Sequence, residues 1–493
     1  MAKAAALPGT ASANTIRVIP ESTSTLGVGI VALFIVALLV PLVIQIGPLR
    51  LSFYRVVLLA TFFPTVVQIF RNPSIRICSV DILVTAFTFY VALSFAVTGA
   101  SVATIGIHIV ETLGPYCLAR AFIRSSEDFI RCARVFVLCI ILTIPFALYE
   151  NVTRDPIILT VLGKFLKVLP NVPHEQRFGL DRAQVVFDHP ILYGLFSAGG
   201  FSFALYTWRL RSGTRPAFVV GALVGLAAFL SLSSAALVCV ALQSGLFAYD
   251  RIMRAWRGRW AALLWSGGIL YTVLELASNR SMAQISISFL AMNPGTAWTR
   301  LLVNEAAVEE IKKFPFFGAG LGYEWHPPSH VVTTSIDNFW LAVAFRNGYP
   351  SAALILAAAL AALIVVGRVR QEDERVRACQ TAFCITLASL SVSIFTVHLW
   401  NASYVLLFYL LGCALWVRDA PAAVETPASE TEDEADTGSR VQYTRFASRG
   451  NSRVLAGAPP VNRTQSSAAS QPARPSNHAA PLRSTGRVPP IGD

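Results

Sequence analysis

Charged residues are scarce in this chain of 493 residues: Asp, Glu, Lys and Arg make up 14% of it, whereas hydrophobic residues make up 54%. Between positions 26 and 417, long apolar runs recur, each roughly the 20 residues that a helix needs to cross a bilayer. In lipid such a run must be helical, because backbone polar groups find no water there. The composition therefore excludes an ordinary soluble domain and predicts an all-α, polytopic membrane protein.

The apolar runs predict about twelve transmembrane helices. With a cytoplasmic N-terminus, every even-numbered connection is rich in arginine, as the positive-inside rule requires. Two spans fit 216–249 better than one, because a single span would place the arginines of 251–259 outside. The predicted spans are 26–46, 51–69, 79–98, 102–122, 134–149, 188–207, 216–232, 233–249, 260–278, 338–366, 378–395 and 398–417.

Three further features limit the class of protein. The net charge of +12 is largely accounted for by the cytoplasmic connections, so no nucleic-acid partner is expected. Residues 1–24 are polar and rich in Ala, Ser and Thr, so we expect a cytoplasmic tail there and no cleavable signal peptide. Residues 418–493 are nearly free of aromatics and are expected to form a disordered cytoplasmic tail. The domain between them, 25–417, holds the predicted spans.

Only two predicted external loops are large, 150–187 and 279–337, and neither contains a cysteine, which argues against structural disulfides and a cysteine zinc site. Function is expected in these loops. They carry three arginines suited to bidentate contact with phosphate: Arg177, Arg182 and Arg300. Ion pairs with acids of the loops, or contacts with lipid phosphates, are the alternative interpretation of each.

The segment 314–350 joins the second loop to a long apolar run. Gly318, Gly320 and Gly322 permit positive φ and close backbone approach, either to a ligand or within a plain turn. Asp337 is either the N-cap of the next helix or a carboxylate held at the membrane surface as a general base. Arg346 precedes Gly348 and a proline, and the run 338–366 is long, so we expect a helix break there.

The external loops also bear on metal binding. His326 and His330 have the spacing of two ligands on one helical turn, but Pro327 and Pro328 between them exclude that helix. No Asp-x-Asp metal motif occurs in either loop, which favours a metal-independent reaction. We therefore predict neither a metal nor a cofactor.

These motifs together resemble the bacterial O-antigen ligase and polymerase family of membrane glycosyltransferases, over residues 25–417. The most specific block is Arg300, the glycine-containing stretch from Pro315, and Asp337-Asn338 with Gly348. A second match is Arg182 with Asp188-His189-Pro190 and Gly194, and a third is Gly114-Pro115-Tyr116 with Arg120 and Arg124.

The resemblance implies transfer of a glycan from undecaprenyl pyrophosphate to an acceptor sugar hydroxyl at the periplasmic face of the bacterial inner membrane. It implies catalytic roles for Asp337 and Arg300. The substrate-binding residues that it implies are Arg177, Arg182, His189, Gly318, Gly320, Gly322, Asn338 and Arg346. Expected partners are the lipid-linked donor, the acceptor glycan, membrane lipid, a chain-length regulator and a flippase.

Other functions remain open on the sequence alone. Ligases of the family often carry histidine where this chain has Asp337, which favours a polymerase of exopolysaccharide or O-antigen over a ligase acting on lipid A core. A flippase or exporter of lipid-linked sugars should place ionisable groups along a central path. Here they concentrate in the external loops.

Overall fold

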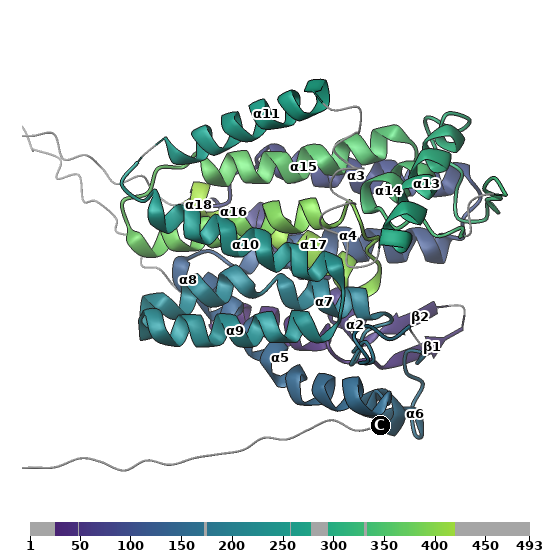
Figure 1. Cartoon of the computed structure of the whole chain (residues 1–493), viewed down its shortest axis with the longest axis horizontal. Coiled ribbons are helices and arrows are strands. Elements are labelled where there is room, and N and C mark those ends of the chain that lie inside the picture. Colours follow the sequence, from purple (N-terminus) through teal and green to yellow (C-terminus); the bar gives the residue numbers. More distant parts are fainter. Residues whose placement is uncertain are drawn as a thin grey trace, which may run out of the picture. The chain divides into compact units, whose positions relative to one another are not determined.

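The structure, a computed structural model, describes residues 25–47, 49–171, 175–256, 258–277, 294–329 and 333–419. The predicted tail 1–24 lies outside the described residues, as do 278–293, His174 and His330. The predicted tail 418–493 lies outside them as well, except for Arg418 and Asp419, which are helical. The described part consists mainly of helices packed side by side (Figure 1).

The first half of the chain forms a small hairpin and nine helices. Their bounds are α1 Thr25–Ala37, β1 Val43–Ile46, β2 Leu49–Ser52, α2 Phe53–Arg71, α3 Ser79–Val97, α4 Val102–Phe122, α5 Ser126–Thr153, α6 Ile157–Gly163, α7 Pro190–Ala198, α8 Phe201–Ser212 and α9 Thr214–Leu230.

The second half is helical wherever an element is assigned. Its helices are α10 Ser234–Ile252, α11 Arg259–Ala277, α13 Pro294–Ile311, α14 Phe339–Asn347, α15 Tyr349–Gly367, α16 Glu374–Ser393, α17 Asn401–Cys413 and α18 Trp416–Asp419.

Nine described helical segments are long and apolar enough to cross a membrane, judged by length and composition. They are α2, α3, α4, α5, α10, α11, α15, α16 and the segment Asn401–Asp419. The predicted class, a mainly helical polytopic membrane protein, is confirmed. Each of the twelve predicted ranges contains at least one helix, but α1 and α9 are shorter, and the number of crossings stays a prediction.

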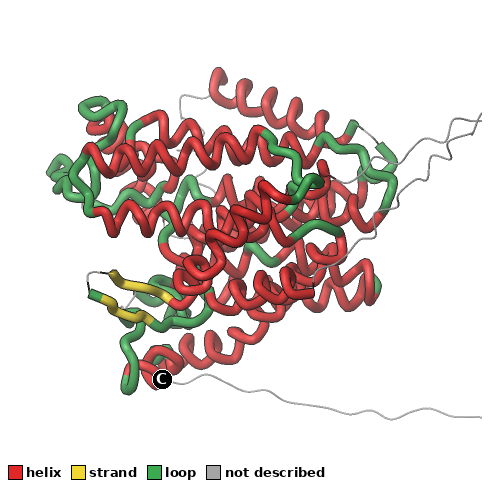
Figure 2. Tube along the Cα trace, turned by 180° about the vertical axis from the view of Figure 1, so that it is seen from behind, coloured by secondary structure: helices red, strands yellow, loops and turns green. Residues whose placement is uncertain are grey.

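The first predicted span, 26–46, is wrong in its second half. Helix α1 ends at Ala37, and Val43–Ile46 pair with Leu49–Ser52 as an antiparallel hairpin, seen in yellow in Figure 2. Pro41 cannot donate a backbone hydrogen bond to a continued helix. The β-branched residues after it favour a strand. The fold is therefore not purely α-helical.

The expected break in the run 338–366 is confirmed. Helix α14 ends at Asn347 and α15 begins at Tyr349, with Gly348 between them at φ +85°. A Cβ atom at position 348 would lie 1.7 Å from the carbonyl oxygen of Phe316. Only glycine fits this crowded left-handed position, so the break is fixed by sequence.

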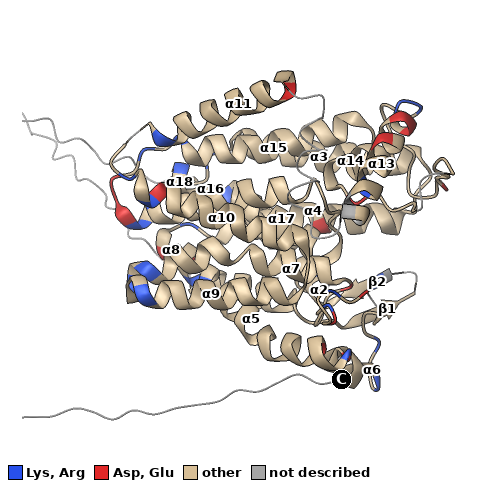
Figure 3. Ribbon diagram, viewed as in Figure 1, with Lys and Arg blue, Asp and Glu red and all other residues tan. Residues whose placement is uncertain are grey.

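The helices run between two ends of the bundle. The connections that follow α2, α4, α8, α10 and α15 lie at one end, here called the basic end, where Figure 3 shows Lys and Arg gathered. The hairpin, α6, α13 and the start of α14 lie at the other end, here called the loop end. Charges of both signs occur there (Figure 3).

At the basic end, one buried arginine of α4 ties this helix to α3 and α18. Arg120 is only 1% exposed; its Nη1 lies 2.6 Å from Asp419 Oδ2 and its Nε 3.2 Å from Asp81 Oδ1. Tyr116 also donates to Asp81, at 2.6 Å. Tyr116 and Arg120, which belong to the third motif, therefore stabilise the end of the bundle opposite Asp337.

Candidate functional site

The two residues predicted to be catalytic form an ion pair at the loop end. Arg300 comes from α13 and Asp337 from the segment before α14. Both Nε and Nη2 of Arg300 lie 3.1 Å from Asp337 Oδ2, and the side chains are 23% and 32% exposed. Asp337 Oδ1 accepts a second hydrogen bond, at 2.9 Å, from Ser335 Oγ. The carboxylate is thus oriented on both oxygens and still reaches solvent.

Asn338, not Asp337, caps helix α14. The Asn338 Oδ1 atom accepts the Leu341 backbone N–H at 3.2 Å, and α14 begins at Phe339. The N-cap interpretation of Asp337 is therefore wrong by one position. An asparagine caps a helix about as well as an aspartate, so the cap moves to the residue directly before the first helical turn. The carboxylate of Asp337 is left for Arg300 and Ser335.

Arg177 and Arg182 both contact the turn that joins α9 to α10. Arg177 Nη1 donates to the Leu232 carbonyl oxygen at 2.7 Å, and Arg182 Nε donates to that of Ser231 at 3.4 Å. Cations at a helix C-terminus are favourable. The hydrogen bond to Ser231 uses only the Nε of Arg182. The Nη2 of the same guanidinium is buried and has no hydrogen-bond partner in the described part of the chain.

The loop that carries Arg182 is held by a buried carboxylate. Glu150, at the end of α5, is 4% exposed and accepts the backbone N–H groups of Gln184 at 3.0 Å and Val185 at 2.8 Å. Each oxygen of the carboxyl group accepts one of these two hydrogen bonds. They fix the loop two residues after Arg182 and so limit where its guanidinium can lie.

The three predicted phosphate-binding arginines lie close enough to repel one another. Burial first, and then repulsion from Arg177 and Arg300, lower the pKa of Arg182 to about 10. The pKa of Arg177 is likewise lowered, first by burial and then by Arg300. Arg300 arrives from the second large loop, whereas the other two belong to the first. The fold therefore joins both loops in one positively charged cluster, called here the arginine cluster.

The glycine-containing loop packs on its own chain. Ala319 N–H donates to the Phe345 carbonyl at 2.8 Å, and Gly320 N–H donates to that of Arg346 at 3.1 Å. A Cβ at position 318 would lie 2.3 Å from the Asn347 nitrogen. Gly318 therefore permits a close approach to α14. Gly320 permits one to Thr98, directly after α3, which a Cβ atom would meet at 2.7 Å.

Gly322 and Arg346 complete this loop differently. A Cβ atom at position 322 would meet nothing within 4 Å, so no packing requires glycine there. Arg346 Nη1 donates to the carbonyl oxygens of Gly320 at 2.9 Å and Leu321 at 3.3 Å. Arg346 thus secures the loop against α14; the ligand-binding roles predicted for it and for the glycines stay predictions.

His189 caps α7 and borders an aromatic wall. Its Nδ1 accepts the Ile191 N–H at 3.1 Å, and its ring meets Trp400 edge to face, with centroids 6.1 Å apart. His398 stacks on Trp400 at 6.0 Å and on Phe339 at 6.2 Å. The four rings connect the start of α7 to the start of α14, and so connect two of the family-like motifs.

Sequence reasoning did not foresee the role of the head of α17. Asn401 Nδ2 donates to Asp188 Oδ2 at 2.9 Å, and its Oδ1 accepts from Arg55 Nη2 at 3.4 Å. Arg55 Nε in turn lies 2.8 Å from Glu111 Oε1, so this acid is paired within the bundle. The signal was the polar and aromatic sequence His-Leu-Trp-Asn at a span end.

His398 has a ring nitrogen, Nδ1, that is buried and finds no hydrogen-bond partner in the described residues. The Nδ1 atom of His326 lies 3.1 Å from the carbonyl oxygen of the neighbouring Glu324. No group of three or more His, Cys, Asp and Glu suited to a metal ion occurs within the described ranges.

No protein-family model matches the chain, and no curated protein matches it significantly.

Proposed function

We propose that this protein is a polysaccharide polymerase of the bacterial inner membrane. It transfers an oligosaccharide from undecaprenyl pyrophosphate to a hydroxyl of an acceptor sugar at the external face. The chain crosses the membrane twelve times in this proposed function, with both large loops outside. The observation that carries it is the arginine cluster, which lies beside a carboxylate at the loop end and leaves one buried guanidinium nitrogen unpartnered.

The arginine cluster supplies what a pyrophosphate leaving group requires. Guanidinium groups neutralise phosphate oxygens through paired N–H donors and keep their charge at low dielectric. Donors fixed before the reaction stabilise charge as it develops on the leaving oxygen. The exposed edge of Arg300 and the unpartnered Nη2 of Arg182 are the donors available to an incoming anion.

Asp337 is the base in the proposed reaction. The acceptor hydroxyl loses its proton to the carboxylate as its oxygen bonds to the anomeric carbon. The bond from that carbon to the pyrophosphate oxygen breaks, and lipid pyrophosphate leaves with the electron pair. An arriving pyrophosphate competes with Asp337 for Arg300, which frees the carboxylate to accept the proton only when donor is present.

The activity is tested with purified protein, lipid-linked repeat units and gel separation of the products. We expect a ladder of polymer from the wild type and a loss of roughly 10²–10³-fold for Arg300→Ala, the effect of removing a donor to developing charge. Lys312→Ala is the matched control, because Lys312 is 58% exposed in a surface pair with Glu309. If Arg300→Ala forms polymer normally, Arg300 does not bind the donor pyrophosphate and the proposed site is wrong.

The acceptor separates polymerase from ligase, since the same reaction serves both. The assay is therefore run with lipid-linked repeat units alone and with lipid A core added. Growth of the repeat-unit ladder supports the polymerase. Transfer of single units to lipid A core, without a ladder, assigns the protein as a ligase instead.

The topology is tested by labelling cysteines with a membrane-impermeant thiol reagent in spheroplasts. We expect Glu175→Cys and Pro328→Cys to react, because both positions are exposed in the two large loops, and Gly450→Cys not to react. The eight native cysteines are buried or half-buried, so background labelling should be low. Labelling at position 450 alone would contradict the twelve-span topology.

A further inference from the structure

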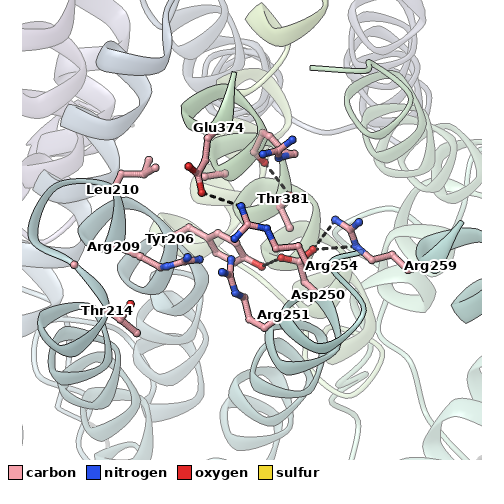
Figure 4. Close-up of a pocket in the computed structure, with 13 residues that line it drawn as sticks. Tyr206, Arg209, Leu210, Thr214, Asp250, Arg251, Arg254, Arg259, Glu374 and Thr381 are labelled. Atoms are coloured by element: carbon pink, nitrogen blue, oxygen red, sulfur yellow. Dashed lines mark hydrogen bonds and ion pairs between the residues drawn. The ribbon is translucent and has the colours of Figure 1, made fainter. Parts of the chain in front are cut away.

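A cavity of about 360 Å³ lies at the basic end, away from the arginine cluster. It is bounded by the end of α8, the start of α9, the end of α10 and the starts of α11 and α16 (Figure 4). Pockets that hold small molecules have volumes of roughly 300–1,000 Å³. The cavity is therefore large enough for a phosphorylated ligand.

The lining of this cavity is strongly basic. Five arginines face two carboxylates, Asp250 and Glu374, which leaves three positive charges in excess. The arginines are Arg209, Arg251, Arg254, Arg259 and Arg377. Topology alone places arginines in these connections, but it does not make those of three separate connections converge on one cavity.

Internal pairing accounts for two of the five. Arg259 lies 3.1 Å (Nε) and 2.8 Å (Nη2) from Asp250 Oδ1, and Tyr206 donates to Asp250 Oδ2 at 2.9 Å. Arg254 Nη2 lies 3.2 Å from Glu374 Oε1. Asp250 is 5% exposed, so Tyr206, Asp250 and Arg259 form a fixed floor rather than a mobile surface pair.

The other three arginines carry the excess charge. Within the described residues, the side chains of Arg209, Arg251 and Arg377 form no hydrogen bond and no ion pair with an acid. Figure 4 shows the guanidinium groups of Arg209 and Arg251 beside Tyr206. Helix α9 begins at this cavity after Gly213, with no side-chain cap on its first N–H groups. Such N–H groups favour an anion.

We propose that this cavity binds a phosphate-bearing polyanion with at least two negative charges. Arg209, Arg251 and Arg377 would hold its oxygens, and the Tyr206–Asp250–Arg259 floor would position it. The chemistry suits the headgroup of an anionic lipid or a water-soluble phosphate. The site does not depend on the function proposed for the loop end, because it shares no residue with it.

The test is calorimetric titration of the full chain with inorganic pyrophosphate, in nanodiscs of zwitterionic lipid at constant ionic strength. The pocket variant combines Arg209→Gln, Arg251→Gln and Arg377→Gln. The control variant combines Arg71→Gln, Arg131→Gln and Arg368→Gln, which lie exposed at the same end outside the cavity and remove the same charge. All three proteins keep the arginine cluster, so a difference between the variants belongs to the cavity.

We expect the pocket variant to lose one pyrophosphate site per chain, or to bind there roughly ten-fold or more weakly. The control variant should match the wild type. A second arm repeats the titration in nanodiscs that contain anionic lipid. If this lipid raises the Tm of the control variant and prevents its pyrophosphate binding, but does neither in the pocket variant, the ligand is a lipid headgroup. Unchanged pyrophosphate binding there indicates a soluble phosphate. Identical titrations of all three proteins, with no variant-dependent effect of lipid, would overturn the proposal.

Discussion

Replacing Arg182 with methionine should reduce polymer formation by about 10²–10³-fold without weakening the fold. Arg182 Nη2 is buried and has no partner in the described residues, and its pKa is lowered to about 10 by burial and by neighbouring arginines. The folded state therefore disfavours this charge, by on the order of 2–3 kcal/mol at neutral pH. Methionine has a similar length and no charge to bury.

The sign of the effect on stability follows from the direction of the pKa shift. A basic group whose folded pKa lies below its ordinary value destabilises the fold at every pH below the folded pKa, here about 10. The penalty disappears only as the pH rises through that value toward the ordinary pKa. At pH 7 we thus expect Arg182→Met to melt at the wild-type temperature or slightly above it.

Activity should change in the opposite direction. If Arg182 binds the donor pyrophosphate, Arg182→Met should reduce polymer formation by about 10²–10³-fold. Arg182→Lys keeps the charge but loses the fork, so it should also be impaired. The matched control is Arg154→Met, since Arg154 is 67% exposed in a surface pair with Asp181. A large drop in melting temperature with normal specific activity would show that Arg182 only supports the α9–α10 turn.

Replacing Asp337 with asparagine should reduce turnover by about 10²–10⁴-fold, the usual contribution of a general base. Asparagine keeps the size of the side chain and an acceptor for Ser335, but it loses the proton affinity and the ion pair with Arg300. Because Asn338 caps α14, the substitution leaves the helix start intact. Melting temperature should therefore remain near that of the wild type.

Two companions separate a base from a residue that only holds Arg300. Ser335→Ala removes the 2.9 Å hydrogen bond to Asp337 and leaves the carboxylate, so its effect should be less than about ten-fold. A base also produces an acidic limb in the pH–rate profile, which Asp337→Asn should lose. Near-normal turnover by Asp337→Asn would refute the catalytic role. Asp337→His then tests whether the ligase-like residue can act in its place.

The local pattern of the sequence predicted the helices well because the bilayer makes each span nearly autonomous. Every backbone group must be paired within its own helix, so hydropathy alone places most spans. The break at Gly348 was also local, since a left-handed residue is needed wherever the helix turns so sharply. The failure at 38–46 has a local cause as well, in Pro41 and the strand-forming residues that follow it.

The sequence by itself determined the class of the protein, most of its helices and the candidate residues at the loop end. Only the tertiary structure decided which of those residues meet. Arg300 pairs with Asp337 across 37 positions, and Arg177 reaches the Leu232 carbonyl across 55. Such contacts depend on how each helix is rotated and packed against its neighbours, which is set by side-chain fit rather than by hydropathy. Helix packing also forms the arginine-lined cavity. In the sequence its arginines look like those of any cytoplasmic connection, and only the packed helix ends bring them together.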